Sequence, residues 1–454
     1  MGSQVHPKLT STRQLQSVLK LAGTSLADLG PASWSVLDQA VVSLGSFLTS
    51  IALARSLSNS DYGVYSTLVA VLLFLHGIHN SLIVTPLLIQ GAACSSSERR
   101  RRFTASALFT GLLALPSMVV VLVLVVAWGR QPLWLWAPAA LATWQLQETM
   151  RRSLMCSLSH RRAVLGDAIS YLGQAALMWH GLWAGWVSLE RAFVVMAITS
   201  AAAALIQALQ LKPAPVEIRE LRETAKSYWA FGRWILYTSF ASVLSAQAFH
   251  WVLSLFQGPE ATASFQAALN VLGIAHPLMF GLGNLLAPAI SKANVAAGSR
   301  VAWRTTQRHG IHFGLLLLPY FSLVFAVPSK LLSWLYGPIS PYLSMDYQLR
   351  LLSLAYCLLF FAHINVSFLT NIGDVRSTFN IQLLVATLSI GVALPLAAIF
   401  GSTGACAGVL LVNLAKFLFA FYFRRCRTFA AVAEPRTALP DAVSLINSSP
   451  ISSS

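Results

Sequence analysis

The sequence has little charge and little cysteine. Only 10% of its 454 residues are charged, whereas 56% are hydrophobic, and the mean hydropathy is +0.65. Soluble globular proteins have roughly 25% charged residues, so this composition excludes a large soluble domain and indicates an integral membrane protein. The five cysteines lie far apart and form no C-x-x-C pair, so we expect neither a disulfide framework nor a structural metal site.

The sequence also lacks the motifs of covalent chemistry. No nucleophile–base pair, glycine-rich phosphate loop or aspartate-rich metal motif stands out. We therefore predict that the chain is not an enzyme and uses no cofactor.

Apolar stretches long enough to cross a membrane recur along most of the chain. A transmembrane helix needs about 20 mostly apolar residues. The predicted spans are 34–54, 63–90, 103–127, 132–155, 163–184 and 191–211, then 229–256, 263–290, 309–328, 349–370, 378–400 and 404–423. The sequence thus predicts an all-α polytopic protein with about twelve transmembrane helices in two six-helix bundles.

A polar segment at 212–228 separates the two groups of six and is interpreted as a cytoplasmic linker between an N-terminal lobe, 34–211, and a C-terminal lobe, 229–423. Residues 424–454 are expected to form a disordered cytoplasmic tail. In the cytoplasmic segment 1–33, apolar residues recur at helical spacing beside basic ones, as in an amphipathic surface helix; a frayed leader is the alternative. The prolines that close the second and eighth spans, Pro86 and Pro288, suggest a pseudo-repeat.

The formal net charge of +16 is distributed unevenly between the loops. Twenty-four lysines and arginines fall in one alternate set of connections and termini, and four fall in the other. By the positive-inside rule the first set is cytoplasmic, which places both termini inside. Topology alone explains runs such as Arg99–Arg102, so we expect membrane lipids, and no nucleic acid, as partners.

Basic residues inside spans are costly, so each requires a reason. Lys416 lies deep in the last span and is a candidate for the wall of a central cavity, with snorkelling inward as the alternative. Arg233, near the cytoplasmic edge of the seventh span, is either an interfacial anchor or a cavity residue. Arg55 closes the first span at the outer face, where a boundary charge and a functional role both remain open.

Uncharged polar residues in mid-span form a second group of cavity candidates. His76, His79 and Asn80 lie at i, i+3 and i+4 in the second span and so share a face that must contact protein or water. The seventh and eighth spans carry Gln247, His250, Gln266, Asn270 and His276 at comparable depth. Interhelical hydrogen bonding is the alternative for each of these residues. A metal site at His76 and His79 is not expected, because no third ligand is suitably spaced.

Three acids, Asp38, Glu148 and Asp167, lie near the cytoplasmic ends of spans. Pairing with Arg151 and Arg152 is one interpretation. The other assigns Asp38 as the proton or cation site of an ion-coupled exporter.

The run Ala54-Arg55-Ser56-Leu57, followed by Asp61-Tyr62-Gly63-Val64-Tyr65, resembles the signature of the polysaccharide transporter family, the flippases of lipid-linked O-antigen and exopolysaccharide units. Leu335-Tyr336-Gly337-Pro338 and the closing prolines continue the resemblance over most of 34–423. The second half departs from it, because Ala261-Thr262 stands where a Tyr-Gly pair would match.

This resemblance implies the two-bundle fold of the multidrug/oligosaccharidyl-lipid/polysaccharide exporter superfamily. It implies a flippase of the bacterial inner membrane that moves a polyprenyl-diphosphate-linked oligosaccharide to the periplasmic leaflet by alternating access, working with other polysaccharide-assembly proteins. The basic mid-span residues favour this anionic cargo over that of the main alternative, a multidrug or organic-cation antiporter of the same fold. A polysaccharide polymerase or ligase is less favoured, since the longest outer loop, 328–348, carries only Lys330.

Overall fold

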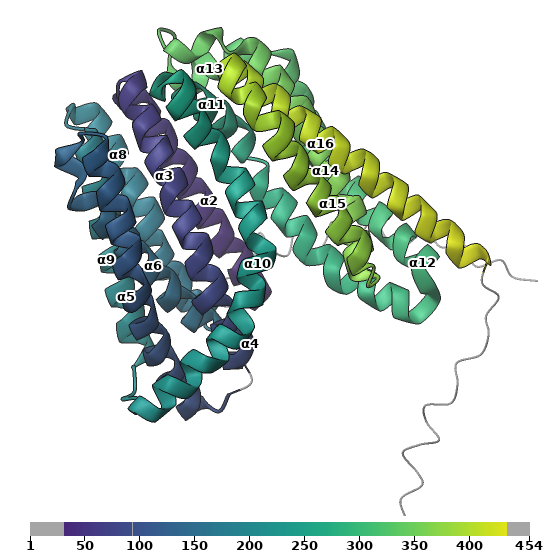
Figure 1. Cartoon of the computed structure of the whole chain (residues 1–454), viewed down its shortest axis with the longest axis horizontal. Helices are drawn as coiled ribbons and strands as arrows, with labels where there is room; N and C mark the ends of the chain where they lie inside the picture. The colour runs from purple at the N-terminus through teal and green to yellow at the C-terminus, as the bar shows by residue number, and fades with distance from the viewer. Residues whose placement is uncertain (1–30, 93, 434–454) are drawn as a thin grey trace, which may run out of the picture.

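The computed structural model describes residues 31–92 and 94–433, and within them every regular element is helical. Figure 1 shows the N-terminal helices gathered on the left and the C-terminal helices on the right. The mean hydropathy and the helical content together make this a multi-pass membrane protein. The predicted amphipathic segment before residue 31 lies outside the described residues.

The N-terminal lobe contains six helical crossings, of which two are interrupted by a π-helical turn. Its elements are α2 (Pro31–Ser56), α3 (Asn59–His79) with η2 (Asn80–Val84) and α4 (Thr85–Ala92), α5 (Ser96–Ala127), η3 (Gln131–Leu133), α6 (Trp136–Cys156), α7 (His160–Asp167) with η4 (Ala168–Leu172) and α8 (Gly173–Ala184), and α9 (Leu189–Leu211).

The C-terminal lobe repeats this order. Its elements are α10 (Ile218–Gln257), α11 (Pro259–Gly273), α12 (His276–Ala326), α13 (Pro328–Tyr336), η5 (Pro341–Ser344), α14 (Asp346–Asn371), α15 (Val375–Leu388) with η6 (Ser389–Ala393), and α16 (Leu394–Ala433). Gly298 in α12 and Gly401 in α16 have positive φ angles of 78° and 61°, so each of these long elements is two helices joined at a glycine.

The described chain has twelve crossings, as predicted. Seven helices are long and apolar enough to span a membrane by length and composition alone. Two of the seven, His276–Ala326 and Val375–Arg427, contain a glycine joint and provide two crossings each. Three more crossings are more polar or are interrupted: α6, the α7–η4–α8 series and α10.

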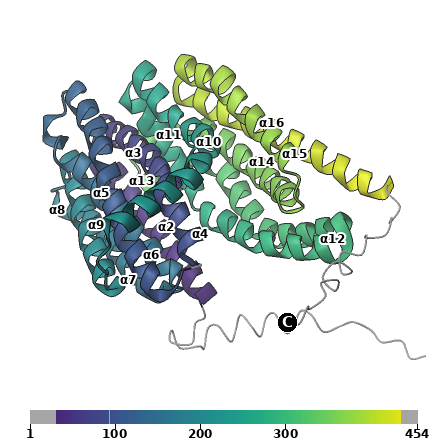
Figure 2. The same ribbon diagram turned by 60° about the horizontal axis from the view of Figure 1, so that its bottom comes forward.

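Two boundary predictions are wrong. The segment 212–228 is a non-helical link only as far as residue 217, because Glu217 and Glu220 form a capping box that starts α10 at Ile218. The disordered tail was predicted to begin at residue 424, but α16 continues to Ala433. Figures 1 and 2 show this end of α16, with α12, reaching away from the N-terminal lobe.

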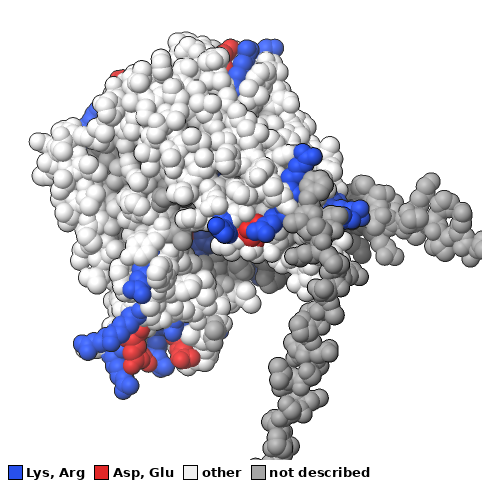
Figure 3. All heavy atoms as spheres, turned by 45° about the vertical axis from the view of Figure 1, so that its right-hand side comes forward, with Lys and Arg blue, Asp and Glu red and all other residues white. Residues whose placement is uncertain are grey.

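The two ends of the molecule differ in charge. We call the end that carries Arg99–Arg102 and Lys212 the basic end, and the end that carries Arg55, Asp61 and α13 the far end. Figure 3 shows lysine and arginine gathered at the basic end, below a broad belt of uncharged residues. Leucine, valine and isoleucine side chains are exposed along α5, α9 and α12, as a lipid-facing surface requires.

The lobes meet where α3 packs against α10 and α11. Gly63 of α3 makes this approach possible: a Cβ atom there would lie 1.8 Å from the carbonyl oxygen of Pro259. The 40-residue helix α10 contacts both lobes, since it packs against α3, η2, α4 and α5 on one side and against α11 and α16 on the other. The lobes are therefore held together at the far end and by α10.

Candidate functional site

A cavity of about 1580 Å³ lies between the two lobes. Most of its wall is formed by α2, α3, α10, α11, α15 and α16, and one or two residues from each of α6, η4, α8, α9, α12, α14 and η6 complete it. It reaches from Ser50 and Asn270, toward the far end, to Gln39, Trp234 and Val375, the first residue of α15, toward the basic end. None of the residues at the far-end turns belongs to its wall, so the cavity opens toward the basic end.

The described residues that line the cavity include no lysine, arginine, aspartate or glutamate. The wall is instead made of apolar and aromatic side chains with neutral hydrogen-bonding groups between them. The neutral polar residues include Gln39, Ser43, Ser46, Ser50, Ser170, Gln174, Gln247, Gln266, Gln382 and Asn413. The basic residues considered as cavity candidates from the sequence, Arg55, Arg233 and Lys416, are not among the lining residues.

A hydrogen-bonded network lies at the closed end of the cavity, on the side of the far end. We call this network, made of Ser50, Tyr62, His250, Gln266 and Asn270, the apex network. The Ser50 hydroxyl donates to the Asn270 amide oxygen at 3.0 Å and lies 2.9 Å from the Tyr62 hydroxyl. Asn270 Nδ2 donates to the same Tyr62 hydroxyl at 2.8 Å. These bonds cross from α2 and α3 to α11 and so join the lobes.

The network continues within the C-terminal lobe. Gln266 Nε2 donates to the Asn270 amide oxygen at 2.8 Å, and Gln266 Oε1 lies 2.7 Å from His250 Nε2. Three of the predicted cavity residues, His250, Gln266 and Asn270, are therefore brought together at the wall. Two further predicted residues, Gln247 and His276, also line it, and His276 Nε2 lies 3.2 Å from the Tyr356 hydroxyl.

Arg55 lies at the far end, outside the cavity. Its guanidinium donates to the carbonyl oxygens of Leu335 at 2.5 Å and Trp334 at 2.7 Å, and it also stacks over Trp179. It thereby ties α2 to α13 across the lobes. The two segments that carry the family resemblance, at 54–65 and 335–338, meet in this way, which their sequence positions alone did not reveal.

The predicted face His76, His79 and Asn80 does not line the cavity. His79 is fully buried inside the N-terminal lobe, where its Nε2 lies 3.2 Å from Thr110 Oγ1 and 3.0 Å from Thr149 Oγ1. His76 lies behind Trp144, on which it stacks at 4.2 Å. The shared face does avoid lipid, but it faces the interior of one lobe rather than the space between the two.

Two basic candidates also lie off the wall. Arg233 is half-buried on α10, with its guanidinium 5.5 Å from the Trp234 ring. Lys416 shares a face of α16 with Val412 and Asn413, which do line the cavity, but it lies one turn nearer the basic end. Lys416 therefore lies outside the cavity wall, near the opening of the cavity at the basic end.

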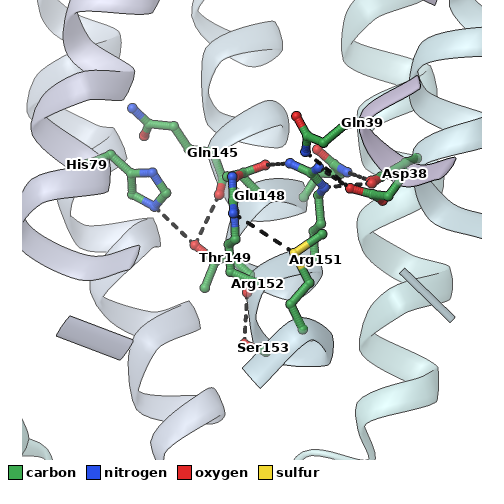
Figure 4. Close-up of polar contacts among 12 residues, drawn as sticks. Asp38, Gln39, His79, Gln145, Glu148, Thr149, Arg151, Arg152 and Ser153 are labelled. Carbon is green, nitrogen blue, oxygen red and sulfur yellow. Dashed lines mark hydrogen bonds and ion pairs between the residues drawn. The ribbon is translucent and has the colours of Figure 1, made fainter. Parts of the chain in front are cut away.

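The three acids converge on one arginine inside the N-terminal lobe. Figure 4 shows two of them, Asp38 and Glu148, beside Arg151. Arg151 donates through Nε to Asp167 at 2.6 Å, through Nη1 to Glu148 at 3.0 Å and through Nη2 to Asp38. Arg152 donates to the other oxygen of Glu148 at 2.5 Å. We call these five residues the ion cluster. The predicted pairing with Arg151 and Arg152 is confirmed, and Asp38 is fully buried within it.

The fifth crossing of each lobe contains a π-helical segment, η4 in one and η6 in the other. Ser170 and Tyr171 of η4 and Ser389 of η6 line the cavity. Single π turns widen a helix locally and are frequent at functional sites. No residue pattern predicted them, because hydrophobic periodicity does not report one extra residue in a turn.

The described residues contain no group of three histidine, cysteine, aspartate or glutamate side chains arranged to hold a metal ion. The described cysteines are all unpaired with one another.

No protein-family model and no curated protein sequence matches the chain. Solved structures do match it over most of its length. An inward-facing multidrug resistance MATE family transporter of the MOP superfamily gives a TM-score of 0.71 at 14% identity, covering 87% of this chain and 96% of that one.

An outward-facing MATE family transporter gives a TM-score of 0.59 at 14% identity, covering 88% of this chain and 94% of that one. A MOP superfamily transporter from Pyrococcus furiosus, described as having a binding pocket of reverse polarity, gives 0.56 at 14% identity, with coverage of 88% and 94%. The chain therefore has the twelve-helix, two-bundle fold seen in MATE transporters of the MOP superfamily.

Proposed function

We propose that the chain is an alternating-access transporter that exports an amphipathic organic molecule through the cavity between its lobes. The observation that carries this proposal is the cavity itself, which opens to the basic end and is closed at the far end by the apex network and Arg55. The positive-inside rule makes the basic end cytoplasmic. In this state the chain is ready to take up cargo from the cytoplasm or the inner leaflet.

The wall defines the class of cargo. Aromatic and apolar side chains offer surface for a ring or an alkyl group, and the neutral amides and hydroxyls offer hydrogen bonds. The described wall has no carboxylate to attract a cation and no lysine or arginine to hold a diphosphate. Neutral amphipathic molecules therefore suit it best. Of the alternative considered from the sequence, a multidrug or organic-cation antiporter, this favours the multidrug form, and the multidrug transporters among the similar structures support it.

A lipid-linked oligosaccharide is the second candidate. Its sugars would find the same neutral hydrogen-bonding wall and the exposed aromatic rings of Trp234 and Tyr237. The diphosphate would remain near Lys416 and the basic end, outside the cavity. The motif at 54–65 also supports this cargo. The tail of such a lipid would stay in the bilayer, so the cavity need accept only the headgroup.

The ion cluster supplies a route for coupling export to an ion gradient. Three carboxylates face two guanidinium groups, which leaves one negative charge in excess inside the lobe. An uncompensated charge is costly there, so a proton or cation that enters the cluster is bound favourably. Asp38 is the group that joins this cluster to α2, one wall of the cavity.

A blocked cavity tests the proposal. Ser46 is an exposed wall residue of α2, and Ser46→Trp should place an indole in the passage. Leu44→Trp is the matched control, because Leu44 is exposed on the same helix but does not line the cavity. Purified protein in proteoliposomes is assayed for movement of a dansyl-labelled alkyl amide and, separately, of a fluorescent polyprenyl-diphosphate oligosaccharide.

Transport lost in Ser46→Trp and kept in Leu44→Trp would support the passage, and the cargo that moves would decide between the two candidates. Movement of both cargoes at unchanged rate in Ser46→Trp would overturn the proposal.

A further inference from the structure

The apex network contains groups that a cargo can reach and groups that it cannot. Ser50, Gln266, Asn270 and His250 line the cavity, whereas Tyr62, fully buried, does not. The network therefore extends from the closed end of the cavity into the contact between the lobes. A molecule that fills the cavity touches the same amide that holds the far end closed.

Asn270 is the central residue of this arrangement. Its amide oxygen accepts from Ser50 at 3.0 Å and from Gln266 at 2.8 Å, and its amide nitrogen donates to Tyr62 at 2.8 Å and to Tyr336 at 3.4 Å. An asparagine side chain has two donor hydrogens and two acceptor lone pairs, so all four positions are used. A cargo group can bind Asn270 only by replacing one of these partners.

The replaceable partners are those of the opposite lobe. Gln266 is one turn away on the same helix, so its bond to Asn270 does not join the lobes. The bonds to Ser50 and Tyr62 do. Beside them, the far-end closure includes the contact of Gly63 with Pro259, the two bonds of Arg55, and the edge contact of the Tyr62 ring with the Tyr342 ring. Exchange of the Ser50 bond for a cargo bond removes a connection between the lobes without leaving a buried polar group unpaired.

We propose that the apex network is a cargo-sensing latch, released by a cargo hydroxyl or amide group that takes over the hydrogen bonds of Asn270. This rests on the proposed transport function and adds a rule of selection to it. Amphipathic molecules that carry a hydrogen-bonding group at their leading end bind and are exported. Molecules of the same size without such a group occupy the apolar wall but leave the lobes joined, because they have no differential affinity for the open state.

The test compares two dansyl-labelled alkyl amides that differ only in a terminal hydroxyl or methyl group. Transport is measured in proteoliposomes. Separation of the lobes at the far end is measured by double electron–electron resonance between spin labels at Trp183 and Ile339, which are both highly exposed. The labels are attached in a variant whose five native cysteines are replaced and whose transport has been checked.

Two variants weaken the latch with little change of volume. Ser50→Ala and Tyr62→Phe each remove one hydroxyl of the network. The matched control is Ser56→Ala on the same helix, since the Ser56 hydroxyl donates to the Ala52 carbonyl of its own helix and lies outside the cavity.

We expect the native protein to move the hydroxyl amide at least several-fold faster than the methyl amide, and only the hydroxyl amide to lengthen the far-end distance. Ser50→Ala and Tyr62→Phe should increase the far-open population without cargo and bring the two rates together, while Ser56→Ala should behave as the native protein does.

Equal rates for the two amides in the native protein, or a far-end distance that neither variant changes, would overturn the latch. Failure of the native protein to move either amide, with the distance still responding to the hydroxyl amide alone, would support the latch and count against the proposed transport.

Discussion

The two lobes share a backbone plan but differ in what fills their interiors. In the N-terminal lobe the first, fourth and fifth crossings are joined by the ion cluster around Arg151. From α11 onward, the one ion pair of the described chain joins Arg427 to Asp374 at the basic end, and Arg427 is exposed. The interior there is held by aromatic rings, such as Phe360 with Phe361 and His276 with Tyr356.

This difference shows that the two lobes share the arrangement of their helices but not the chemistry of the side chains inside them. Both fifth crossings carry a π segment, and both second crossings are broken near their middle, by η2 in one lobe and at residues 274–275 in the other. A buried charge network fixes the relative positions of its helices, because separating them would expose unpaired charges. We therefore expect the N-terminal lobe to move as a rigid body and the C-terminal lobe to deform more readily.

Removal of the central arginine should have the largest effect, because it acts on the charged interior that distinguishes the N-terminal lobe. Arg151→Ala leaves three buried carboxylates without their main partner, and losses of about 3–5 kcal/mol are typical when one partner of a buried pair is removed. We expect little folded protein in the membrane fraction, checked by fluorescence-detected size-exclusion chromatography. Arg152→Ala is the control, since Arg152 is partly exposed and should cost clearly less. Equal yields of the two variants would contradict a central role for Arg151.

Neutralising one acid should separate the contribution of the ion cluster to protein stability from its contribution to ion coupling. Asp38→Asn balances the formal charge of the cluster and retains a hydrogen-bond acceptor for Arg151. We expect folded protein that still transports downhill but no longer responds to an imposed proton or sodium gradient. Gradient-driven uptake in proteoliposomes measures this. A response equal to that of the native protein would remove Asp38 from coupling.

The C-terminal lobe has its own test at Lys416. Because Lys416 lies one turn beyond the cavity wall, Lys416→Glu should slow entry of an anionic cargo several-fold and leave a neutral cargo nearly unaffected. Initial rates for the oligosaccharide diphosphate and the neutral amide give the comparison. The opposite order of sensitivity would mean that Lys416 acts from inside the passage.

The smallest effect is expected at Asp374, which caps α15 and pairs with Arg427. Burial raises the pKa of Asp374, but hydrogen bonds from Arg427 and Ser377 outweigh burial and hold this pKa below its ordinary value. Its stabilisation is thus present at neutral pH and is lost as the pH falls through the lowered pKa.

Asp374→Asn keeps the cap and removes the charge, so the melting temperature at pH 7 should fall slightly, by an amount equivalent to less than about 1 kcal/mol. Asp374→Ala also removes the cap and should lower it further. Identical melting curves for both variants would show that neither the cap nor the ion pair contributes.

The sequence predicted the number and grouping of the helices because each crossing needs its own apolar stretch, whatever its neighbours are. It also predicted His250, Gln266 and Asn270 as cavity residues, since polar groups in mid-span must avoid lipid. It could not separate them from His76 and His79, because a helical face that avoids lipid can turn toward the interior of its own lobe or toward the other lobe. Ser50 and Tyr62 were missed as apex residues, since hydroxyls are common in membrane helices.

Helix α10 has a consequence for how the protein can be divided. It packs on α3, η2, α4 and α5 of the N-terminal lobe as far along as Trp251, whose ring centroid lies 5.5 Å from that of Phe74, and it also packs on α11 and α16 of the C-terminal lobe. The chain link that precedes it ends at residue 217. A cut at 212–217 would give two fragments of which the second still carries a helix shaped to dock on the first. Co-produced halves should therefore find each other and reassemble, and α10 must bend wherever the lobes swing apart.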